Sequence, residues 1–277
     1  MGHEDTAKNA AEGSAPDPMA IAQEVAASIA SGSQIEPFSN RPHGLDLQTA
    51  YRVQGHLRAL RGAPVVGRKI GFTNRTIWPL YGVEAPMWGD VTEASLANLS
   101  AVDSVPLGAF CEPRLEPEVA LCLSEDPDPA MDETDLIAIT LWMAPAFEIV
   151  HSIYPAWRFQ LADTVACGGL HGRLLLGEPL RNVADFAGDL PALTLRLERN
   201  GEVVETGSGT NVLGGPLSAL KHCVAEVAKD PSQTQLKAGD IVTTGTLTDA
   251  WSIKPGETWR AHYDGTPFAS TTVRFAE

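Results

Sequence analysis

The sequence predicts an α+β fold with a β-rich core and a small helical lobe before it. Many short apolar runs separated by turn residues follow residue 65, with few helical stretches among them. With 44% hydrophobic residues, a chain of 277 residues can bury a substantial core. We therefore expect a tail over residues 1–18, a helical lobe over residues 19–64 and a β-rich domain over residues 65–277.

The first 64 residues divide into an expected tail and two expected helices. Residues 1–18 are rich in Ala, Gly, Pro, Asp and Glu, which predicts a disordered tail. Small apolar residues then recur at helical spacing over residues 19–31. A second helix is expected from about Asp46 to about Leu60, because Gly62 and a following proline stop it.

Strand patterns dominate from residue 65. The Asn200-Gly201 pair is a strong signal for a type I′ hairpin turn. In chain order we expect a strand over 65–72, a helix over 74–81, a strand within 105–123, a helix over 132–138, a strand over 139–150, a hairpin over 192–205, a helix over 216–229, a strand over 240–246, and paired strands over 259–263 and 271–275.

The net charge, the lack of long apolar runs and the cysteines limit the classes of partner and the cellular compartment that we expect. A formal net charge of −15 argues against nucleic acid or an anionic membrane surface as a binding partner, since both are bound by clustered lysine and arginine side chains. No run of about 18 apolar residues and no basic-then-hydrophobic N-terminus is present, so we expect neither a transmembrane segment nor a signal peptide. The 4 cysteines form no CxxC pair and are expected to be reduced thiols of a cytoplasmic protein.

Two glutamates two residues apart interrupt what otherwise reads as a buried strand. Glu116 and Glu118 would share one face of that strand, with apolar neighbours such as Val119 on the other. Two like charges side by side are expensive to bury unless a cation compensates them. Mg²⁺ is the usual compensation, because it binds carboxylates together with water and substrate oxygens. The alternative is a solvated edge strand with a charged outer face.

A third carboxylate strengthens the metal hypothesis. Glu148 is the only charged residue in the apolar run over residues 139–150, so it needs a cation, a shifted pKa or a hydrogen-bond partner unless it faces the surface. With Glu116 and Glu118 it would form a facial set of oxygen ligands, which favours Mg²⁺ or Mn²⁺ over zinc. Glu112, four residues before Glu116, falls on the same face nearer the start of the strand and is a spare ligand.

Two further segments have the composition of an anion-binding site. Lys69 lies between glycines at a strand end, where it can approach a bound anion closely, and a lowered pKa near a metal would suit acid–base chemistry. An ordinary surface lysine is the alternative. Residues 244–248 follow a strand and supply hydroxyls and N–H groups that suit a carboxylate or keto oxygen.

A glycine-rich stretch over residues 161–172 contains one acid, Asp163, and one histidine, His171. It lacks the glycine spacing and the preceding strand of a dinucleotide fingerprint, so dinucleotide binding is rejected. His171 is either structural or catalytic, whereas His151 and His222 are expected to be structural. No Gly-x-Ser-x-Gly elbow is present, which argues against a serine hydrolase.

Six collinear segments resemble the 2-oxopent-4-enoate hydratase and 4-oxalocrotonate decarboxylase family, within the fumarylacetoacetate hydrolase superfamily. They are GRKIGFT at 67–73, LEPEVA at 115–120, PAFEIV at 145–150, NGEVVETG at 200–207, VLGGPLSAL at 212–220 and LKAGDIVTTG at 236–245. Any one block is weak, but six in the same order are specific.

The resemblance implies a mixed β-roll core of the fumarylacetoacetate hydrolase C-terminal type, with Mg²⁺ or Mn²⁺ on Glu116, Glu118 and Glu148. A small-molecule 2-oxo acid would chelate that metal, and the protein would be a homo-oligomer. The site residues expected on this basis are Lys69 and His171 as catalytic groups, and Thr73, Asp163, Thr246 and Thr248 as substrate-binding groups.

Two departures from the family pattern bear on the reaction. Hydratases of this family carry an acid in a Pro-Asp-Phe-Gly pattern, where this chain has Met87, and decarboxylases carry an apolar residue there. The family's Ala-Asp-Asn-Ala-Ser-Ser loop is replaced here by residues 166–171. His171 would then be a substitute proton carrier, and Glu84 would partly replace the missing acid.

The leading hypothesis is a metal-dependent lyase that hydrates an unsaturated 2-oxo acid in aromatic-compound degradation. A 4-oxalocrotonate-type decarboxylase is the first alternative. A C–C bond hydrolase acting on an acylpyruvate is the second, although its Ser-Ala-Arg-Asp segment is not visible. A non-catalytic relative is the third, and the intact carboxylate trio with Lys69 argues against it.

Overall fold

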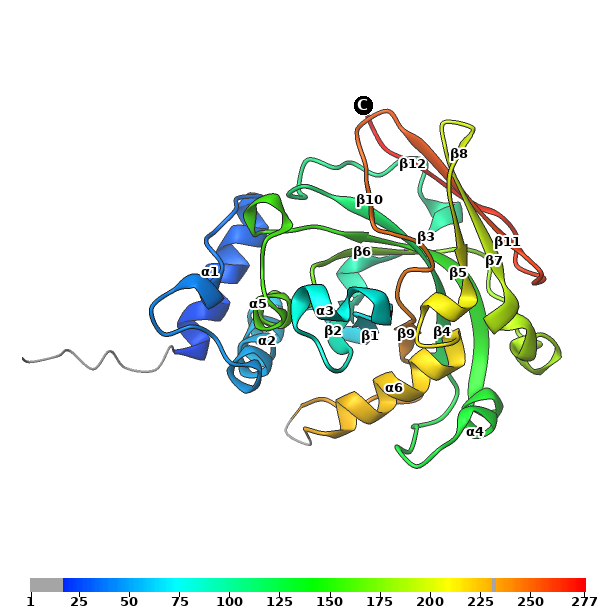
Figure 1. The fold of residues 1–277 in the computed structure, drawn as a ribbon, viewed down its shortest axis with the longest axis horizontal. Helices are drawn as coiled ribbons and strands as arrows, with labels where there is room; N and C mark the ends of the chain where they lie inside the picture. The colour runs from blue at the N-terminus through cyan, green and yellow to red at the C-terminus, as the bar shows by residue number, and fades with distance from the viewer. Residues whose placement is uncertain (1–16, 231–232) are drawn as a thin grey trace, which may run out of the picture.

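The structure is a computed structural model that describes residues 17–230 and 233–277. Two sheets and six α-helices make up the described fold, which confirms the α+β prediction (Figure 1). The helices are α1 (Pro18–Ser31), α2 (Leu47–Arg61), α3 (Trp78–Tyr81), α4 (Glu133–Ala138), α5 (Leu161–Ala166) and α6 (Pro216–Ala228). The predicted tail lies outside the described residues except for its last two, Asp17 and Pro18, which cap and begin α1.

The larger sheet has eight strands and the smaller one has four. The larger follows the order β2-β1-β9-β4-β5-β6-β3, with β10 paired to β4, and the smaller follows β12-β11-β7-β8. Because β1 pairs in parallel with β9 and β3 with β6, the larger sheet is mixed. The strands are β1 (Val65–Gly71), β2 (Met87–Thr92), β3 (Leu96–Asn98), β4 (Arg114–Leu123), β5 (Thr140–Val150), β6 (His171–Leu176), β7 (Thr194–Arg199), β8 (Glu202–Ser208), β9 (Ile241–Thr243), β10 (Trp251–Ser252), β11 (Thr258–Asp264) and β12 (Thr271–Arg274).

The main core joins the two sheets and α6. The odd-numbered residues of β4, such as Val119 and Leu121, are fully buried in one cluster with Leu195 of β7, Trp259 of β11 and Leu220 of α6. Period-2 alternation therefore places the even-numbered residues of β4, including both of its glutamates, on the other face of the strand.

The N-terminal helices end where their capping residues dictate. The Asp46 carboxylate accepts the Thr49 amide at 2.8 Å, and Gly62 closes α2 in the left-handed conformation that glycine tolerates. Helices α1 and α2 lie beside α5 on one side of the molecule, and Val25, Val53 and Val165 share one buried cluster (Figure 1). The division of the chain at residue 64 stays a prediction.

Several element predictions need correction. Residues 161–172, expected as a glycine-rich loop, contain α5 and the start of β6, because Gly168 and Gly169 form the turn between the two and Gly172 lies within the strand. Strands β2, β3, β6 and β10 were not predicted. The strand expected over 240–246 covers only residues 241–243, whereas the strand expected within 105–123 is confirmed as β4. The hairpin turn is confirmed, with positive φ at Asn200 and Gly201.

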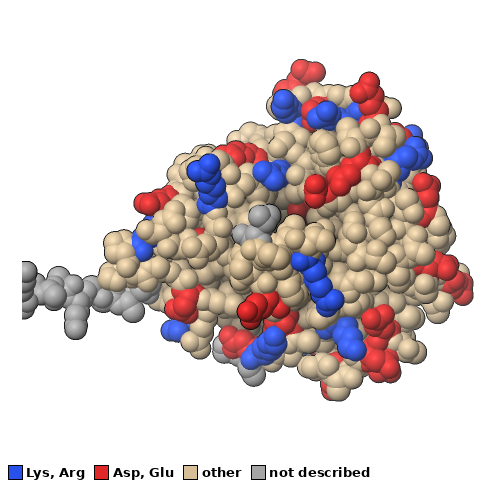
Figure 2. Space-filling view, in the orientation of Figure 1, with Lys and Arg blue, Asp and Glu red and all other residues tan. Residues whose placement is uncertain are grey.

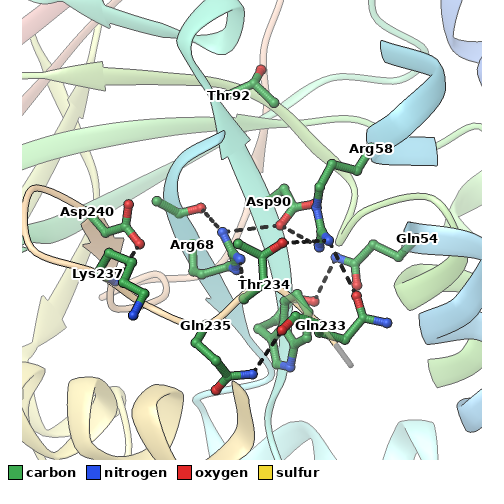
Figure 3. A network of polar contacts seen from close by, with 12 residues as sticks. Gln54, Arg58, Arg68, Asp90, Thr92, Gln233, Thr234, Gln235, Lys237 and Asp240 are labelled. Carbon is green, nitrogen blue, oxygen red and sulfur yellow. Dashed lines mark hydrogen bonds and ion pairs between the residues drawn. The ribbon is translucent and has the colours of Figure 1, made fainter. Parts of the chain in front are cut away.

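A buried polar network holds β1 on the face opposite Lys69 (Figure 3). Both carboxylate oxygens of Asp90 accept from Arg58 of α2, at 2.7 and 3.1 Å, and Arg68 of β1 lies 3.3 Å from one of them. Arg68 is fully buried and also donates to the Thr234 carbonyl at 2.7 Å. Since Arg68 and Lys69 are adjacent in a strand, Lys69 faces the opposite side of β1. In the described ranges, no helix is long and apolar enough to cross a membrane.

Candidate active site

Glu116, Glu118 and Glu148 come together on one face of the larger sheet. The antiparallel register of β4 and β5 places Glu116 directly opposite Glu148, and Glu118 lies one alternation further along β4. One carboxylate oxygen from each glutamate lies within 4.8 Å of the other two. The structure therefore gathers the three acids that the sequence singled out.

Burial makes this cluster electrostatically costly. Glu118 and Glu148 are fully buried, and Glu116 is partly buried. Burial raises the pKa of Glu116 to about 7, where Glu148 adds to the rise and Lys69 opposes it. Burial and the two neighbouring acids raise the pKa of Glu118 well above its ordinary value. Burial also acts to raise the pKa of Glu148, but Lys69 and His171 outweigh it and lower that pKa.

Each of the two fully buried glutamates, Glu118 and Glu148, has one carboxylate oxygen with a hydrogen-bond partner and one without. One Glu118 oxygen accepts the Gly245 amide at 2.9 Å, and one Glu148 oxygen lies 2.8 Å from His171 Nδ1. The remaining oxygens, Glu118 Oε1 and Glu148 Oε2, are buried without a hydrogen-bond partner, and the Lys69 ammonium lies 3.4 Å from Glu148 Oε2. Buried carboxylate oxygens without donors are costly, and a hard divalent cation satisfies them with little rearrangement. The three residues therefore fit Mg²⁺ or Mn²⁺.

Lys69 lies beside this cluster. Its ammonium donates to the Gly169 carbonyl at 3.1 Å and lies 3.4 Å from Glu148 Oε2. Burial alone would lower the pKa of Lys69, but Glu148, Glu116 and Glu118 raise it to about 12. The surface-lysine alternative is therefore wrong. The lowered pKa expected near a metal is not present in the protein alone, because the negative charge of the three carboxylates favours the protonated form of Lys69.

Two glycines permit close approaches at the cluster. Gly169 has a φ of 78°, and a Cβ there would lie 2.8 Å from the Lys69 side chain. Gly245 has a φ of 89°, and a Cβ there would lie 2.0 Å from Thr73 Oγ1. Any larger residue at Gly245 would push the loop off Thr73 and remove the amide that holds Glu118.

A cavity of about 350 Å³ opens beside Lys69 and Glu116. Figure 2 shows a hollow near the middle of one face of the molecule, with both acidic and basic residues on its border. Thr73, Thr246 and Thr248, all predicted substrate-binding residues, line this cavity. The other lining residues are Ile70, Gly71, Phe72, Asn74, Ile77, Tyr81, Met87, Arg114, Val150, Trp157, Phe159, Thr164, Gly169, Leu170, Gly245, Asp249 and Ala250.

Asp163 does not belong to this group. Its carboxylate accepts the Ser39 amide at 3.0 Å, the Ser39 hydroxyl at 2.5 Å and the Gln160 amide at 2.9 Å. It is fully buried at the start of α5 and is not among the cavity-lining residues. Asp163 therefore caps α5 and ties it to Ser39, and the structure does not bring it together with the cavity-lining residues.

His171 lies behind the acid cluster. Its Nδ1 is bonded to Glu148, its Nε2 lies 2.9 Å from Ser95 Oγ, and it does not line the cavity. Both ring nitrogens are therefore occupied, and His171 is placed to orient Glu148 rather than to reach a substrate. The structure does not support the expected role of proton carrier.

The two other acids considered from the sequence, Glu84 and Glu112, lie outside the cavity lining. Glu84 is exposed and does not line the cavity, so it does not stand in for the acid that Met87 replaces. Glu112 has left the face of the cluster, because its backbone turns to a φ of 45°, and its carboxylate accepts from Gln34 and the Ala156 amide.

Some site residues escaped sequence reasoning. The Gly245 amide and the Gly169 carbonyl are backbone groups, which residue types do not reveal. Ser95 lies in a short segment that carries no motif. Arg114, by contrast, is two residues before Glu116 on the same strand, so the alternation that found Glu116 and Glu118 also points to it.

Comparisons with known proteins agree with this geometry. The fumarylacetoacetate (FAA) hydrolase C-terminal family matches residues 91–274. A 2-keto-4-pentenoate hydratase of Burkholderia vietnamiensis is 34% identical over 254 residues, covering 90% of this chain and 93% of that relative. A 4-oxalocrotonate decarboxylase of Pseudomonas putida is 29% identical over 263 residues, covering 93% of this chain and 96% of that relative.

Solved structures show the same likeness. The 4-oxalocrotonate decarboxylase from Pseudomonas putida G7, complexed with magnesium and adipate, matches with a TM-score of 0.83 at 27% identity. The match covers 93% of this chain and 97% of that one. A fumarylpyruvate hydrolase from Pseudomonas aeruginosa matches at 14% identity with a TM-score of 0.51, a likeness of fold alone.

Proposed function

This chain belongs to the fumarylacetoacetate hydrolase family, and on that premise we propose that it is a metal-dependent lyase acting on an unsaturated 2-oxo acid. The leading reaction is hydration of 2-hydroxypenta-2,4-dienoate, the type of activity named for its hydratase relatives. The observation that carries the proposal is the trio of glutamates within 4.8 Å of one another, beside a buried lysine at a cavity.

The proposed ligands of the metal are Glu116, Glu118 and Glu148. Bound there, Mg²⁺ would act as a Lewis acid that polarises the keto oxygen and stabilises the charge developing on the dienolate. Magnesium in a related decarboxylase supports a divalent metal, and Mn²⁺ is the alternative with the same oxygen preference. The Gly245 amide and the His171 ring keep two of the three carboxylates in place.

Lys69 is the proposed acid–base group. Its Nζ lies at the cavity and is the one buried cation beside the acid cluster in the described part of the chain. The three carboxylates hold its pKa high, so compensation of their charge lowers that pKa toward the range in which Nζ gives and takes a proton. Thr73, Thr246 and Thr248 line the same cavity, and their hydroxyls would orient the acid end of a substrate.

A 4-oxalocrotonate-type decarboxylase is the second candidate, and Met87 favours it. Met87 is buried, lines the cavity, and lies against Gly71 and Gly169 next to Lys69. The family's hydratases place an acid there, so this chain lacks one proton carrier that hydration would use. Loss of CO₂ needs no acid at that point.

Assembly as a homo-oligomer and a cytoplasmic location are part of the same proposal. The family resemblance supports assembly, and four buried free cysteines suit a reducing compartment.

Activity assays separate the candidates. Purified protein with Mg²⁺ is mixed with 2-hydroxypenta-2,4-dienoate and the dienoate absorbance is followed. We expect its loss in the presence of Mg²⁺ and no loss after chelation. CO₂ release from 4-oxalocrotonate without dienoate turnover would establish the decarboxylase instead. Inactivity on both substrates, with Mg²⁺ bound, would contradict the lyase proposal.

A further inference from the structure

Three residues with unusual backbone conformations lie close together, and one of them, Trp157, lines the cavity. Glu112, Ala156 and Trp157 have φ values of 45°, 55° and 56°, in the left-handed region that non-glycine residues rarely adopt. Each such residue costs free energy and persists only where the surrounding structure enforces it. Residues with strained backbones cluster at ligand sites, so the interactions that enforce this strain can point to a role in ligand binding.

Glu112 supplies those interactions. Its side-chain Oε1 accepts the Ala156 amide at 3.0 Å and Gln34 Nε2 at 2.9 Å. Its backbone carbonyl accepts the Trp157 indole N–H at 3.0 Å. Gln34 also donates to the Ser152 carbonyl at 3.0 Å. One exposed glutamate thus ties the loop around Trp157 to the entry of β4 and to the segment between α1 and α2.

The loop that Glu112 holds forms part of the cavity wall. Trp157 lines the cavity, and the Arg114 guanidinium lies over its ring, 4.0 Å from the centroid. A cation over an indole face is attracted to it, which fixes the arginine in the wall. Arg114 Nε is buried, and no hydrogen bond or ion pair to its guanidinium is found among the described residues. Trp157 is therefore the contact that positions this side chain.

We propose that Glu112 is a positioning residue for substrate binding: it locks the loop over residues 155–157 so that Trp157 holds Arg114 in the cavity wall. This inference rests on the proposed function, because it assigns the cavity to a 2-oxo acid. Glu112 itself does not line the cavity, so it acts only through Trp157. The contacts that hold the loop, made by Glu112 with Gln34, Ala156 and Trp157, include none of the three proposed metal ligands.

The test compares Glu112→Ala with Glu112→Gln. Glutamine keeps an acceptor oxygen for the Ala156 amide, whereas alanine removes it. We expect Glu112→Ala to weaken binding of 2-oxopentanoate, measured by calorimetry with Mg²⁺ present, by roughly tenfold, and to raise KM with little change in kcat. Glu112→Gln should bind within about threefold of the parent. Affinity for Mg²⁺ alone should stay unchanged in both variants.

A double-mutant cycle isolates the route through Trp157. In a Trp157→Ala background, Glu112→Ala should weaken 2-oxopentanoate binding no further, because the side chain it positions is gone. Glu84→Ala, an exposed glutamate away from the cavity, is the matched control. Additive losses in the cycle, or unaltered binding in Glu112→Ala, would overturn the inference. Failure of the unmodified protein to bind 2-oxopentanoate with Mg²⁺ would instead refute the proposed function.

Discussion

Glu118 has one carboxylate oxygen bonded to the Gly245 amide and a second, Oε1, that is buried without a partner. With Glu116 and Glu148 beside it, three carboxylates lie next to Lys69, the one buried cation at the cluster among residues 17–230 and 233–277. Removing one partner from such a set changes its binding of a dication far more than its packing, because the side chains of Glu and Gln are nearly the same size.

Glu118→Gln should therefore lower Mg²⁺ affinity by more than about 100-fold, since loss of an outer contact alone costs 10–100-fold. Calorimetric titration with Mg²⁺ measures this. Lys69→Ala is the control, and it should leave the affinity intact or tighten it because it removes a competing positive charge. Unchanged affinity in Glu118→Gln would remove that residue from the ligand set.

His171 occupies both its ring nitrogens, one on Glu148 and one on Ser95. We expect His171→Asn to reduce Mg²⁺ affinity by about 10–100-fold, with turnover recovering at saturating metal, as for other residues that orient a ligand. Titration of activity with Mg²⁺ separates the two effects. A low rate at saturating Mg²⁺, with normal affinity, would restore the catalytic role expected from the sequence.

At the scale of elements, alternation explains which site residues could be predicted. Glu116 and Glu118 share a face because they are two apart in a strand, and Glu148 stands out as a lone acid in an apolar run. The pairing of Glu116 with Glu148 depends on the β4–β5 register, which the sequence does not specify on its own. Asp163 and His171 do not line the cavity, and the sequence could not show this, because a polar residue in a glycine-rich stretch has the same local pattern whether it caps a helix or contacts a substrate.

The network behind β1 predicts a large effect on stability. Asp90→Asn would leave the fully buried Arg68 and its neighbour Arg58 without their counter-charge. Breaking a buried pair in this way costs about 3–5 kcal/mol, which urea unfolding would report as a lower midpoint with an unchanged slope. Asp126→Asn, which breaks an exposed pair with Lys237, should change the free energy of unfolding far less. Equal effects would show that the network is not what anchors β1.

His151 gives a prediction for pH. Burial lowers its pKa from 6.5 to about 4, and the nearby His171 and Arg61 add to the effect. Between these values the unfolded chain binds a proton that the folded protein does not, so the free energy of unfolding falls as the pH falls. The loss reaches up to about 3 kcal/mol by pH 4.

His151→Asn should therefore flatten the dependence of stability on pH between about 6.5 and 4, relative to the unmodified protein. Denaturant unfolding at a series of pH values measures it. Asparagine can still accept the Cys111 amide, which His151 Nδ1 accepts at 3.4 Å. Parallel curves for the two proteins would mean that folding does not lower the pKa of His151.

For the whole molecule, the fold class followed from strand and helix patterns, but the mixed sheet did not. β2, β3, β6 and β10 are short or carry polar and glycine residues, so their periodicity is weak and only tertiary pairing identifies them. The site forms where β1, β4, β5 and the 244–248 loop meet, so it depends on that long-range pairing. A cation at this junction would tie together segments distant in sequence.

The most direct measurement is a crystal structure of the protein soaked in Mn²⁺, with anomalous scattering used to locate the metal. We expect a single strong peak among Glu116, Glu118 and Glu148, with one oxygen of each at about 2.0–2.3 Å from the ion. Side chains turned apart, or a peak only at other residues, would contradict the account.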